Sequence, residues 1–176
     1  MKKLFVILAA LAAASFGACF AAGDGEGHPM QDRLLDKMVG HWMLTGTIGG
    51  QPTHHTVDAQ WILDHQFLQL HEVGAIDPKT GKREYEALPA IGYDNASERY
   101  VLHWLDVFGG RYSETLGYGR REGDELLFTL EYPDGPFHSS FRWDGAKQQW
   151  RWQMKQKNRD GKWAPFADLF MSKAQK

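Results

Sequence analysis

The sequence predicts an all-β fold, a single closed antiparallel up-and-down barrel of about ten strands. Over most of the chain, apolar and polar residues alternate with a period of two, as in strands with one buried face. Nine groups of turn-forming residues separate these stretches, and nine turns connect ten strands. No helical pattern of useful length interrupts the strands, which excludes parallel βαβ folds. Ten sequential antiparallel strands leave no exposed edge only when the sheet closes on itself, so we expect a barrel.

The chain begins with a segment typical of a secretory signal. Two lysines precede the apolar run Leu4–Ala14, and small residues follow as far as Ala22. The run is too short for a comfortable membrane span. We therefore expect residues 1–22 to be a signal peptide and the protein to be exported, as a periplasmic or a secreted protein. Residues 23–28 then form a flexible glycine-rich linker, and residues 29–176 form the barrel domain.

Two routes of processing stay open. The pair Ala21-Ala22 suits ordinary cleavage, whereas Phe16-Gly17-Ala18-Cys19 resembles a degenerate lipobox. In the second case Cys19 would carry a lipid, and the protein would be a membrane-anchored lipoprotein. In both cases this single cysteine is neither a catalytic thiol of the folded domain nor half of a disulfide within the chain.

A short helix is expected at the start of the barrel domain. Pro29 suits the first turn of a helix, and Gly40 suits its end. Between them the apolar residues fall on one helical stripe formed by Leu34, Leu35 and Met38. A helix of about two to three turns is not stable alone, so we expect it to plug one end of the barrel.

From Trp42 onward the expected strands have one apolar and one polar side. The segment Tyr100–Phe108 is the exception, because it is apolar on both sides and leaves open whether His103 or Trp104 points inward. The apolar positions of the clearest strands are Val57, Ala59, Trp61 and Leu63; Leu126, Phe128, Leu130 and Tyr132; Phe137, Ser139, Phe141 and Trp143; and Trp150, Trp152 and Met154.

Size and charge limit the function. About 150 residues after removal of a signal are enough for a barrel to bury a sizeable core without disulfides or a structural metal. The formal net charge of −2 comes from a near-even mix of acids and bases, which argues against a nucleic-acid partner. Seven Trp, six Tyr and ten Phe supply large rings, which either fill a core or line a pocket.

The Gly40-x-Trp42 motif after a short helix resembles the opening of lipocalins and their calycin relatives. That resemblance implies that Trp42 closes the base of the barrel and that a basic side chain from the last strand lies over it. Lys173 is the residue of this sequence that we expect in that position.

A longer resemblance lies in the middle of the chain. The stretches are Asp64-His65-Gln66-Phe67-Leu68, Glu84-Tyr85-Glu86-Ala87, Ile91-Gly92-Tyr93-Asp94-Asn95 and Tyr100-Val101-Leu102-His103-Trp104-Leu105-Asp106. Together they resemble the exported bacterial family called domain of unknown function 1579, which is placed near the lipocalins. The resemblance implies a fold but carries no catalytic residue. One departure is His65, which stands where a glycine is expected and is therefore predicted at or near positive φ.

The candidate site residues are a polar pair and a set of rings. Asp106 lies between Leu105 and Val107, and an inward position would desolvate its carboxylate unless a donor pairs with it. It is a candidate ligand anchor or general base, and a buried or solvent-facing structural role stays open. His103 is the second candidate polar group. The candidate wall residues of a binding cavity are Trp61, Trp104, Phe128, Phe141 and Trp152.

Other chemistries find little support in the sequence. Adjacent His54 and His55 point to opposite faces of a strand, and no short His or Cys spacing suits zinc, so no metal is expected. A haem site of the nitrobindin kind, which is a related barrel, would need a late-strand histidine facing the cavity. Ser139 and Ser140 lack a Gly-x-Ser-x-Gly elbow.

The first hypothesis is therefore an exported, non-enzymatic barrel that binds a small apolar or amphipathic molecule, without a cofactor. The alternatives are a packed barrel that serves as an envelope interaction module, an enzyme that uses Asp106 as acid or base, and a haem-binding barrel. Contact with a membrane is expected only through a lipid on Cys19. The sequence leaves the oligomeric state and the ligand open.

Overall fold

The computed structural model describes residues 29–110 and 115–174. The expected signal peptide, the linker and Cys19 lie outside these residues, so export, processing and lipidation stay predictions. Within the two described ranges, no helix is long and apolar enough to cross a membrane.

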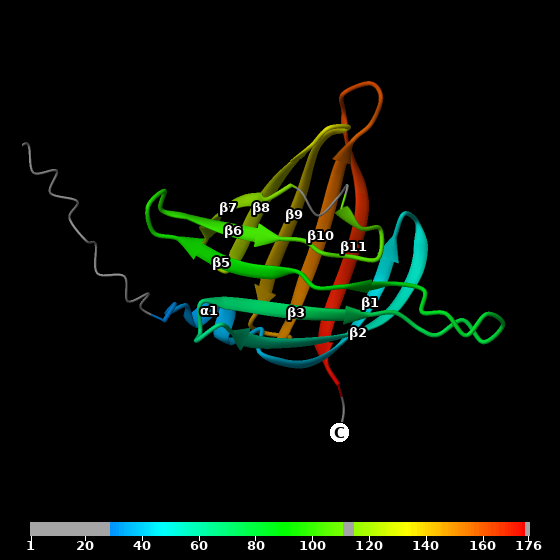
Figure 1. Cartoon of the computed structure of the whole chain (residues 1–176), viewed down its shortest axis with the longest axis horizontal. Helices are drawn as coiled ribbons and strands as arrows, with labels where there is room; N and C mark the ends of the chain where they lie inside the picture. The colour runs from blue at the N-terminus through cyan, green and yellow to red at the C-terminus, as the bar shows by residue number, and fades with distance from the viewer. Residues whose placement is uncertain (1–28, 111–114, 175–176) are drawn as a thin grey trace, which may run out of the picture.

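The described residues contain a short helix and eleven strands (Figure 1). In chain order the elements are α1 (Arg33–Asp36), β1 (Gly40–Ile48), β2 (Gln51–Ile62), β3 (Phe67–Val73), β4 (Glu86–Ala87), β5 (Ala90–Asp94), β6 (Arg99–His103), β7 (Gly117–Glu122), β8 (Glu125–Tyr132), β9 (Gly135–Asp144), β10 (Gln149–Lys157) and β11 (Trp163–Lys173).

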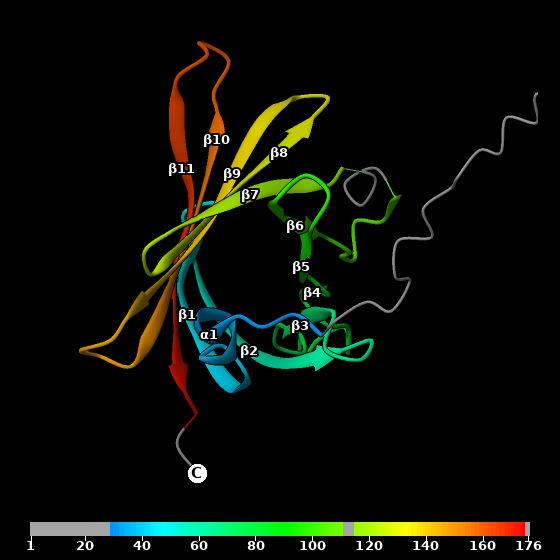
Figure 2. The same cartoon turned by 90° about the vertical axis from the view of Figure 1, so that its left-hand side faces the viewer.

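Ten of these strands form a closed antiparallel ring. Strands that follow each other in the chain pair from β5 to β11, then β11 pairs with β1 and β1 with β2. The pairing of β2 with β3, and of β3 with β5, closes the ring. The two-residue strand β4 adds to β3 outside it. Figure 2 shows the sheet curling round so that its two ends meet. The prediction of a closed all-β antiparallel barrel of about ten strands is confirmed.

The predicted alternation appears as a buried interior face. In β8, for example, Leu126, Phe128 and Leu130 are buried while the residues between them are partly exposed. The largest fully buried side chains are those of Trp42, Trp150, Trp152 and Phe141, and all four belong to one continuous core. Burial of each such apolar side chain contributes roughly 1.5–3 kcal/mol to folding. The barrel is therefore stabilised by one continuous core of aromatic and aliphatic side chains.

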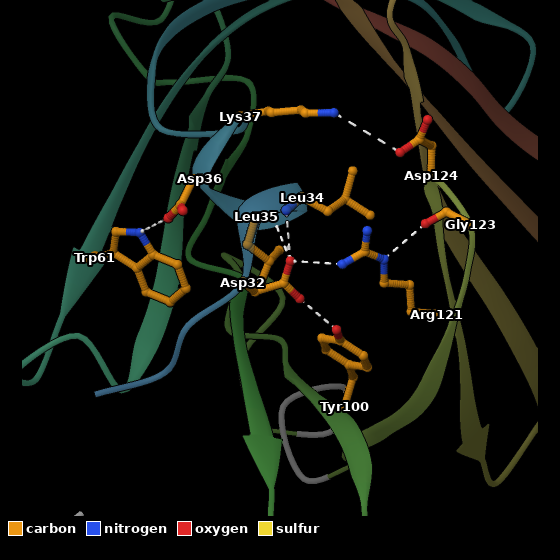
Figure 3. A network of polar contacts seen from close by, with 10 residues as sticks. All are labelled: Asp32, Leu34, Leu35, Asp36, Lys37, Trp61, Tyr100, Arg121, Gly123 and Asp124. Atoms are coloured by element: carbon orange, nitrogen blue, oxygen red, sulfur yellow. Dashed lines mark hydrogen bonds and ion pairs between the residues drawn. The ribbon is translucent and has the colours of Figure 1, made fainter. Parts of the chain in front are cut away.

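The helix α1 is one turn of four residues, shorter than the sequence suggested. Asp32 caps it, because its carboxylate accepts the backbone N–H groups of Leu34 at 2.7 Å and Leu35 at 3.2 Å. The same carboxylate accepts hydrogen bonds from the Tyr100 hydroxyl of β6 at 2.5 Å and from Arg121 Nη1 of β7 at 3.2 Å (Figure 3). The hydrogen bonds that Asp32 accepts from α1, Tyr100 and Arg121 are called the Asp32 clasp below. This clasp and the buried leucines hold the turn, which is too short to be stable alone.

Three further contacts place α1 at one end of the barrel. Trp61, near the end of β2, donates from Nε1 to Asp36 at 3.1 Å, and Trp42, near the start of β1, donates to the Met38 carbonyl at 2.6 Å. Lys37 lies 4.0 Å from Asp124, between β7 and β8. The turn therefore contacts the start of β1 and the far ends of β2 and β7.

The expected strand Tyr100–Phe108 is wrong in its second half. The strand β6 ends at His103, and Asp106 forms only an isolated bridge with Ala87. The cause is local: Asp106 Oδ1 accepts the N–H of Phe108 at 2.8 Å, and such a turn competes with the strand ladder. The open question of side-chain direction is answered by Trp104, which is 9% exposed and belongs to the core.

The β2–β3 turn has an unusual backbone. Leu63, Asp64 and His65 have φ values of 50°, 54° and 63°, so the predicted positive φ at His65 is confirmed. The His65 imidazole stacks on the Trp61 ring with 3.9 Å between centroids. This stacking holds the turn against the α1 end of the barrel.

Candidate functional site

The barrel is packed with side chains near α1 and hollow at its other end. The hollow is a cavity of about 680 Å³. Its lining includes the end of β1, the start of β2, the end of β8 and the start of β9, which are the strand ends remote from α1. Ligand sites in proteins commonly measure roughly 300–1,000 Å³, so the space suits a small organic molecule.

The cavity runs from solvent to the interior. Its mouth carries exposed residues and its floor carries buried ones. The exposed lining residues are Pro52, Glu84, Phe108, Asp134, Gln156 and Lys157, and the buried ones include Thr53, His55, Glu72, Trp104, Leu130 and Met154.

The walls divide into two chemically different halves. The strands β8 to β11 and the end of β1 supply mainly apolar side chains, namely Ile48, Leu130, Phe137, Met154 and Phe166. The opposite wall, from β2, β3 and the segments after β3 and β6, supplies the polar groups of His55, Glu72, Tyr85 and Asp106. The cavity is therefore amphipathic, which is the shape of site that orients a ligand with one polar end.

The deepest polar pair is His55 with Glu72. His55 Nδ1 lies 2.6 Å from Glu72 Oε1, and the two side chains are 9% and 1% exposed. Both side chains point inward from neighbouring strands. Glu72 pairs with Val57 in the β2–β3 register, and His55 is the next inward residue of β2 before Val57, so the two are diagonal neighbours. Gly74 makes room for the pair, since a Cβ there would lie 3.1 Å from His55 Nε2 and 3.0 Å from the Tyr85 nitrogen.

A second polar group lies beside that pair, around Tyr85. Its ring stacks on the His55 imidazole with 5.8 Å between centroids, and its hydroxyl donates to Asp106 Oδ2 at 3.4 Å. Trp104 Nε1 donates to the same oxygen at 3.0 Å. Burial, followed by the negative charges of Glu72 and Asp106, raises the pKa of the Tyr85 phenol well above its usual value. The hydroxyl therefore keeps its proton and acts as a donor to Asp106.

The four side chains form one continuous polar patch, which we call the cavity cluster: His55, Glu72, Tyr85 and Asp106. Its two carboxylates make no ion pair with a lysine or arginine among residues 29–110 and 115–174. Likewise, no group of three or more metal-ligating side chains occurs in the described part of the chain. The cavity cluster can therefore bind a ligand through hydrogen bonds and negative charge, beside the apolar wall.

Two of the seven residues proposed from the sequence as a ligand site line this cavity. They are Trp104 and Asp106, which the cavity cluster brings together. Phe128, Phe141 and Trp152 do not line this cavity; they are at most 2% exposed and pack on one another in the core. The ring of Trp152 supports Trp104 from behind, with 5.6 Å between centroids.

The other two proposed residues lie elsewhere. Trp61 is at the α1 end, where it bonds to Asp36 and stacks on His65. His103 alternates with the buried Leu102 and Trp104, and its ring meets the edge of the partly buried Phe67. Neither lines the cavity.

Sequence reasoning missed His55, Glu72 and Tyr85. His55 and Glu72 had a visible signal, because they continue the inward alternation of their strands with a polar residue. The two adjacent histidines do point to opposite faces of β2, as the sequence predicts, with His54 exposed and His55 buried. Tyr85 follows β3 outside any strand, so no alternation in the sequence marks it as inward.

At the α1 end of the barrel, Trp42 and Lys173 lie in contact. Lys173 Nζ lies 3.7 Å from the centroid of the Trp42 ring and donates to the Val39 carbonyl at 2.9 Å. The two residues also face each other in the β1–β11 register. A cation over an indole face is an attractive contact.

Comparison with known proteins gives a family and a fold. The model of the family described as Protein of unknown function (DUF1579) matches residues 29–170. Among solved structures, the crystal structure of Rv2717c from M. tuberculosis is similar, with 13% sequence identity and a TM-score of 0.51. The match covers 83% of this chain and 100% of that one. At this identity the likeness supports the barrel fold alone. No curated protein matches the sequence.

Proposed function

The chain belongs to the family Protein of unknown function (DUF1579), and because that description assigns no chemistry, we propose from the cavity that the protein binds a small amphipathic molecule inside its barrel. The polar end of the ligand contacts the cavity cluster, and its apolar part lies against the wall formed by β8 to β11. The observation that carries this proposal is the cavity of about 680 Å³ with one polar and one apolar side.

The alternatives fit the same geometry less well. A packed interaction module needs no cavity of this size. For an enzyme with Asp106 as general base the geometry gives no specific support, because the three hydrogen bonds from Tyr85, Trp104 and the Phe108 backbone already give this carboxylate a structural role. The haem hypothesis expected a late-strand histidine in the cavity, but His138 of β9 stacks on Trp163 at 3.8 Å and does not line it.

We also propose that α1 serves as the plug of the closed end. Support comes from the buried leucines of α1, from the Asp32 clasp and from Lys173 over Trp42. A ligand then enters and leaves at the mouth lined by Phe108 and Lys157.

Export stays part of the proposal and has its own test. Residues 1–22 are proposed to direct the chain out of the cytoplasm, with Cys19 acylated or with cleavage after Ala22. Mass spectrometry of protein extracted from the cell envelope measures the mature N-terminus. A chain that starts at acylated Cys19 or at Gly23 supports export, and a chain that retains residues 1–22 contradicts it.

Binding is tested with a neutral apolar dye such as N-phenylnaphthylamine, whose fluorescence rises in an apolar site. The informative variant is Thr53→Phe, because Thr53 is 6% exposed on the inner face of β2 and lines the cavity. The added ring should occupy part of the cavity and weaken dye binding about tenfold or more, that is, by about 1.4 kcal/mol.

The matched control is Thr45→Phe, the same exchange on the outer side of the neighbouring strand β1, next to His54 in the register. It should leave dye binding unchanged, and both variants should melt as cooperatively as the parent. Absence of dye binding to the parent protein, or equal loss in both variants, would refute a ligand site in the barrel.

A further inference from the structure

The cavity cluster has a charge pattern that restricts its ligand further. Four acidic residues line the cavity, namely Glu72, Glu84, Asp106 and Asp134, against one lysine and one histidine. The lysine, Lys157, lies at the mouth, where its Nζ is 5.6 Å from the centroid of the Trp163 ring. The deep part of the cavity therefore has no permanent positive charge among the described residues.

The hydrogen bonds of the cluster point the same way. The Tyr85 hydroxyl and Trp104 Nε1 both donate their hydrogens to Asp106, and His55 Nδ1 is hydrogen-bonded to Glu72. What stays available to a ligand is mostly acceptor capacity, on the two carboxylates and on the tyrosine oxygen. In the neutral imidazole with its proton on Nδ1, Nε2 is an acceptor as well.

An anionic head group would meet mainly like charges and acceptors at the cavity cluster. Glu72 is 1% exposed, so bulk water screens its charge poorly, and a second carboxylate or a phosphate beside it would be repelled. A group with N–H or O–H hydrogens would instead satisfy these acceptors, and a protonated amine would also balance a buried charge.

We infer that the polar end of the ligand is a hydrogen-bond donor, a protonated amine or a hydroxyl, and that carboxylates and phosphates are rejected. This inference rests on the proposed function, since it names the ligand class of the same cavity. The aromatic and aliphatic wall opposite the cluster then receives the hydrocarbon part of the ligand.

The test compares three probes with one tail: decylamine, decanol and decanoic acid, each displacing N-phenylnaphthylamine from the purified protein. We expect decylamine to displace the dye at a concentration at least about tenfold lower than decanoic acid, with decanol between them. Either donor ahead of the acid supports the inference, and the order of the two identifies the preferred head group.

The variants Glu72→Gln and Asp106→Asn assign the effect to the cluster. Each removes one negative charge at nearly constant shape, so each should reduce the preference for decylamine over decanoic acid about tenfold and leave decanol nearly unchanged. The control is Asp58→Asn. Asp58 forms the same 2.6 Å contact with a histidine, His41, but on the surface, where both side chains are more than half exposed.

The possible failures are distinct. Equal displacement by all three probes, or an advantage for decanoic acid, overturns the inference while the barrel still binds ligands. Absence of displacement by every probe overturns the proposed function and the inference together. If Glu72→Gln melts far below the parent, the half-buried Asp106→Asn decides the assignment, and an unchanged probe order in that variant counts against the cluster.

Discussion

The most direct test of the fold is removal of the clasp at α1, with the substitution Asp32→Ala. The Asp32 side chain is 4% exposed and accepts four hydrogen bonds: two from the backbone of α1, one from Tyr100 and one from Arg121. Loss of the helix cap costs about 1 kcal/mol. Loss of a charged acceptor for the tyrosine and the arginine adds about 1–2 kcal/mol, toward the low end because Arg121 is 39% exposed and can bind water instead.

The expected destabilisation is therefore about 2–3 kcal/mol, which lowers the melting temperature of a chain of this size by roughly 5–10 °C. The assay is urea unfolding followed by tryptophan fluorescence, with a thermal melt as a second measurement. Asp32→Asn is the matched variant, since asparagine caps helices as well as aspartate and loses only the charge, so about half the effect should remain. A double-mutant cycle with Tyr100→Phe should give a coupling of about 1 kcal/mol.

Two results would refute this reasoning. Destabilisation of Asp32→Ala below about 0.5 kcal/mol, the range of ordinary surface changes, would mean that the clasp does not hold α1. A change in dye binding at the opposite mouth, at temperatures where the variant is fully folded, would mean that the two ends of the barrel are not independent.

Three further predictions concern a tyrosine, an ion pair and a core ring. Burial and the hydrogen bond to Asp32 raise the pKa of Tyr100 from 10.0 to about 12, so the folded state keeps a proton that the unfolded chain loses; stability should fall as the pH rises from about 10 to 12, and Tyr100→Phe should flatten that fall in alkaline urea titrations. The hydrogen bond and charge of Arg151 lower the pKa of Asp168, so the stability that this pair contributes is present above about pH 3.8 and lost as the pH falls below it; Asp168→Asn should reduce the difference between melting temperatures at pH 7 and pH 3. Phe141→Leu should cost about 1–2 kcal/mol in unfolding measurements without weakening dye binding, because Phe141 packs on Trp152 in the core, and an affinity loss at full folding would return this ring to the cavity wall.

The architecture was predictable because the strands carry their pattern locally. Buried residues alternate with more exposed ones over most of β8, the second half of β9 and the first half of β10, and turn residues mark the ends. The period and the approximate strand number therefore needed no knowledge of partners. The β6 boundary was not predictable in the same way. Trp104 and Leu105 read as strand, but the side chain of Asp106 diverts the backbone into a turn, and an aspartate gives no sign of that until its neighbours are placed.

The site was less predictable than the fold because all interior rings look alike in the sequence. Phe128, Phe141 and Trp104 occupy inward positions of the same kind, yet only the last one borders the cavity. The difference is position along the barrel axis, which depends on how far each strand is displaced relative to its neighbours. Alternation reports the face of a strand and carries no information about that displacement.

The two strands that carry the buried His55–Glu72 pair suggest a sharper criterion for locating a cavity. The inward positions of β2 run Thr53, His55, Val57, Ala59 from its first end, and those of β3 run Leu68, Leu70, Glu72 toward its last. Antiparallel pairing brings the polar end of one against the polar end of the other. A buried polar group is costly unless it has a partner, so inward polar residues at matching ends of paired strands mark where a barrel stops being filled and begins to hold something else. On this criterion Thr53, His55 and Glu72 mark the cavity end, while the apolar inward positions that follow in β2 (Val57, Ala59) and precede in β3 (Leu68, Leu70) belong to the packed core.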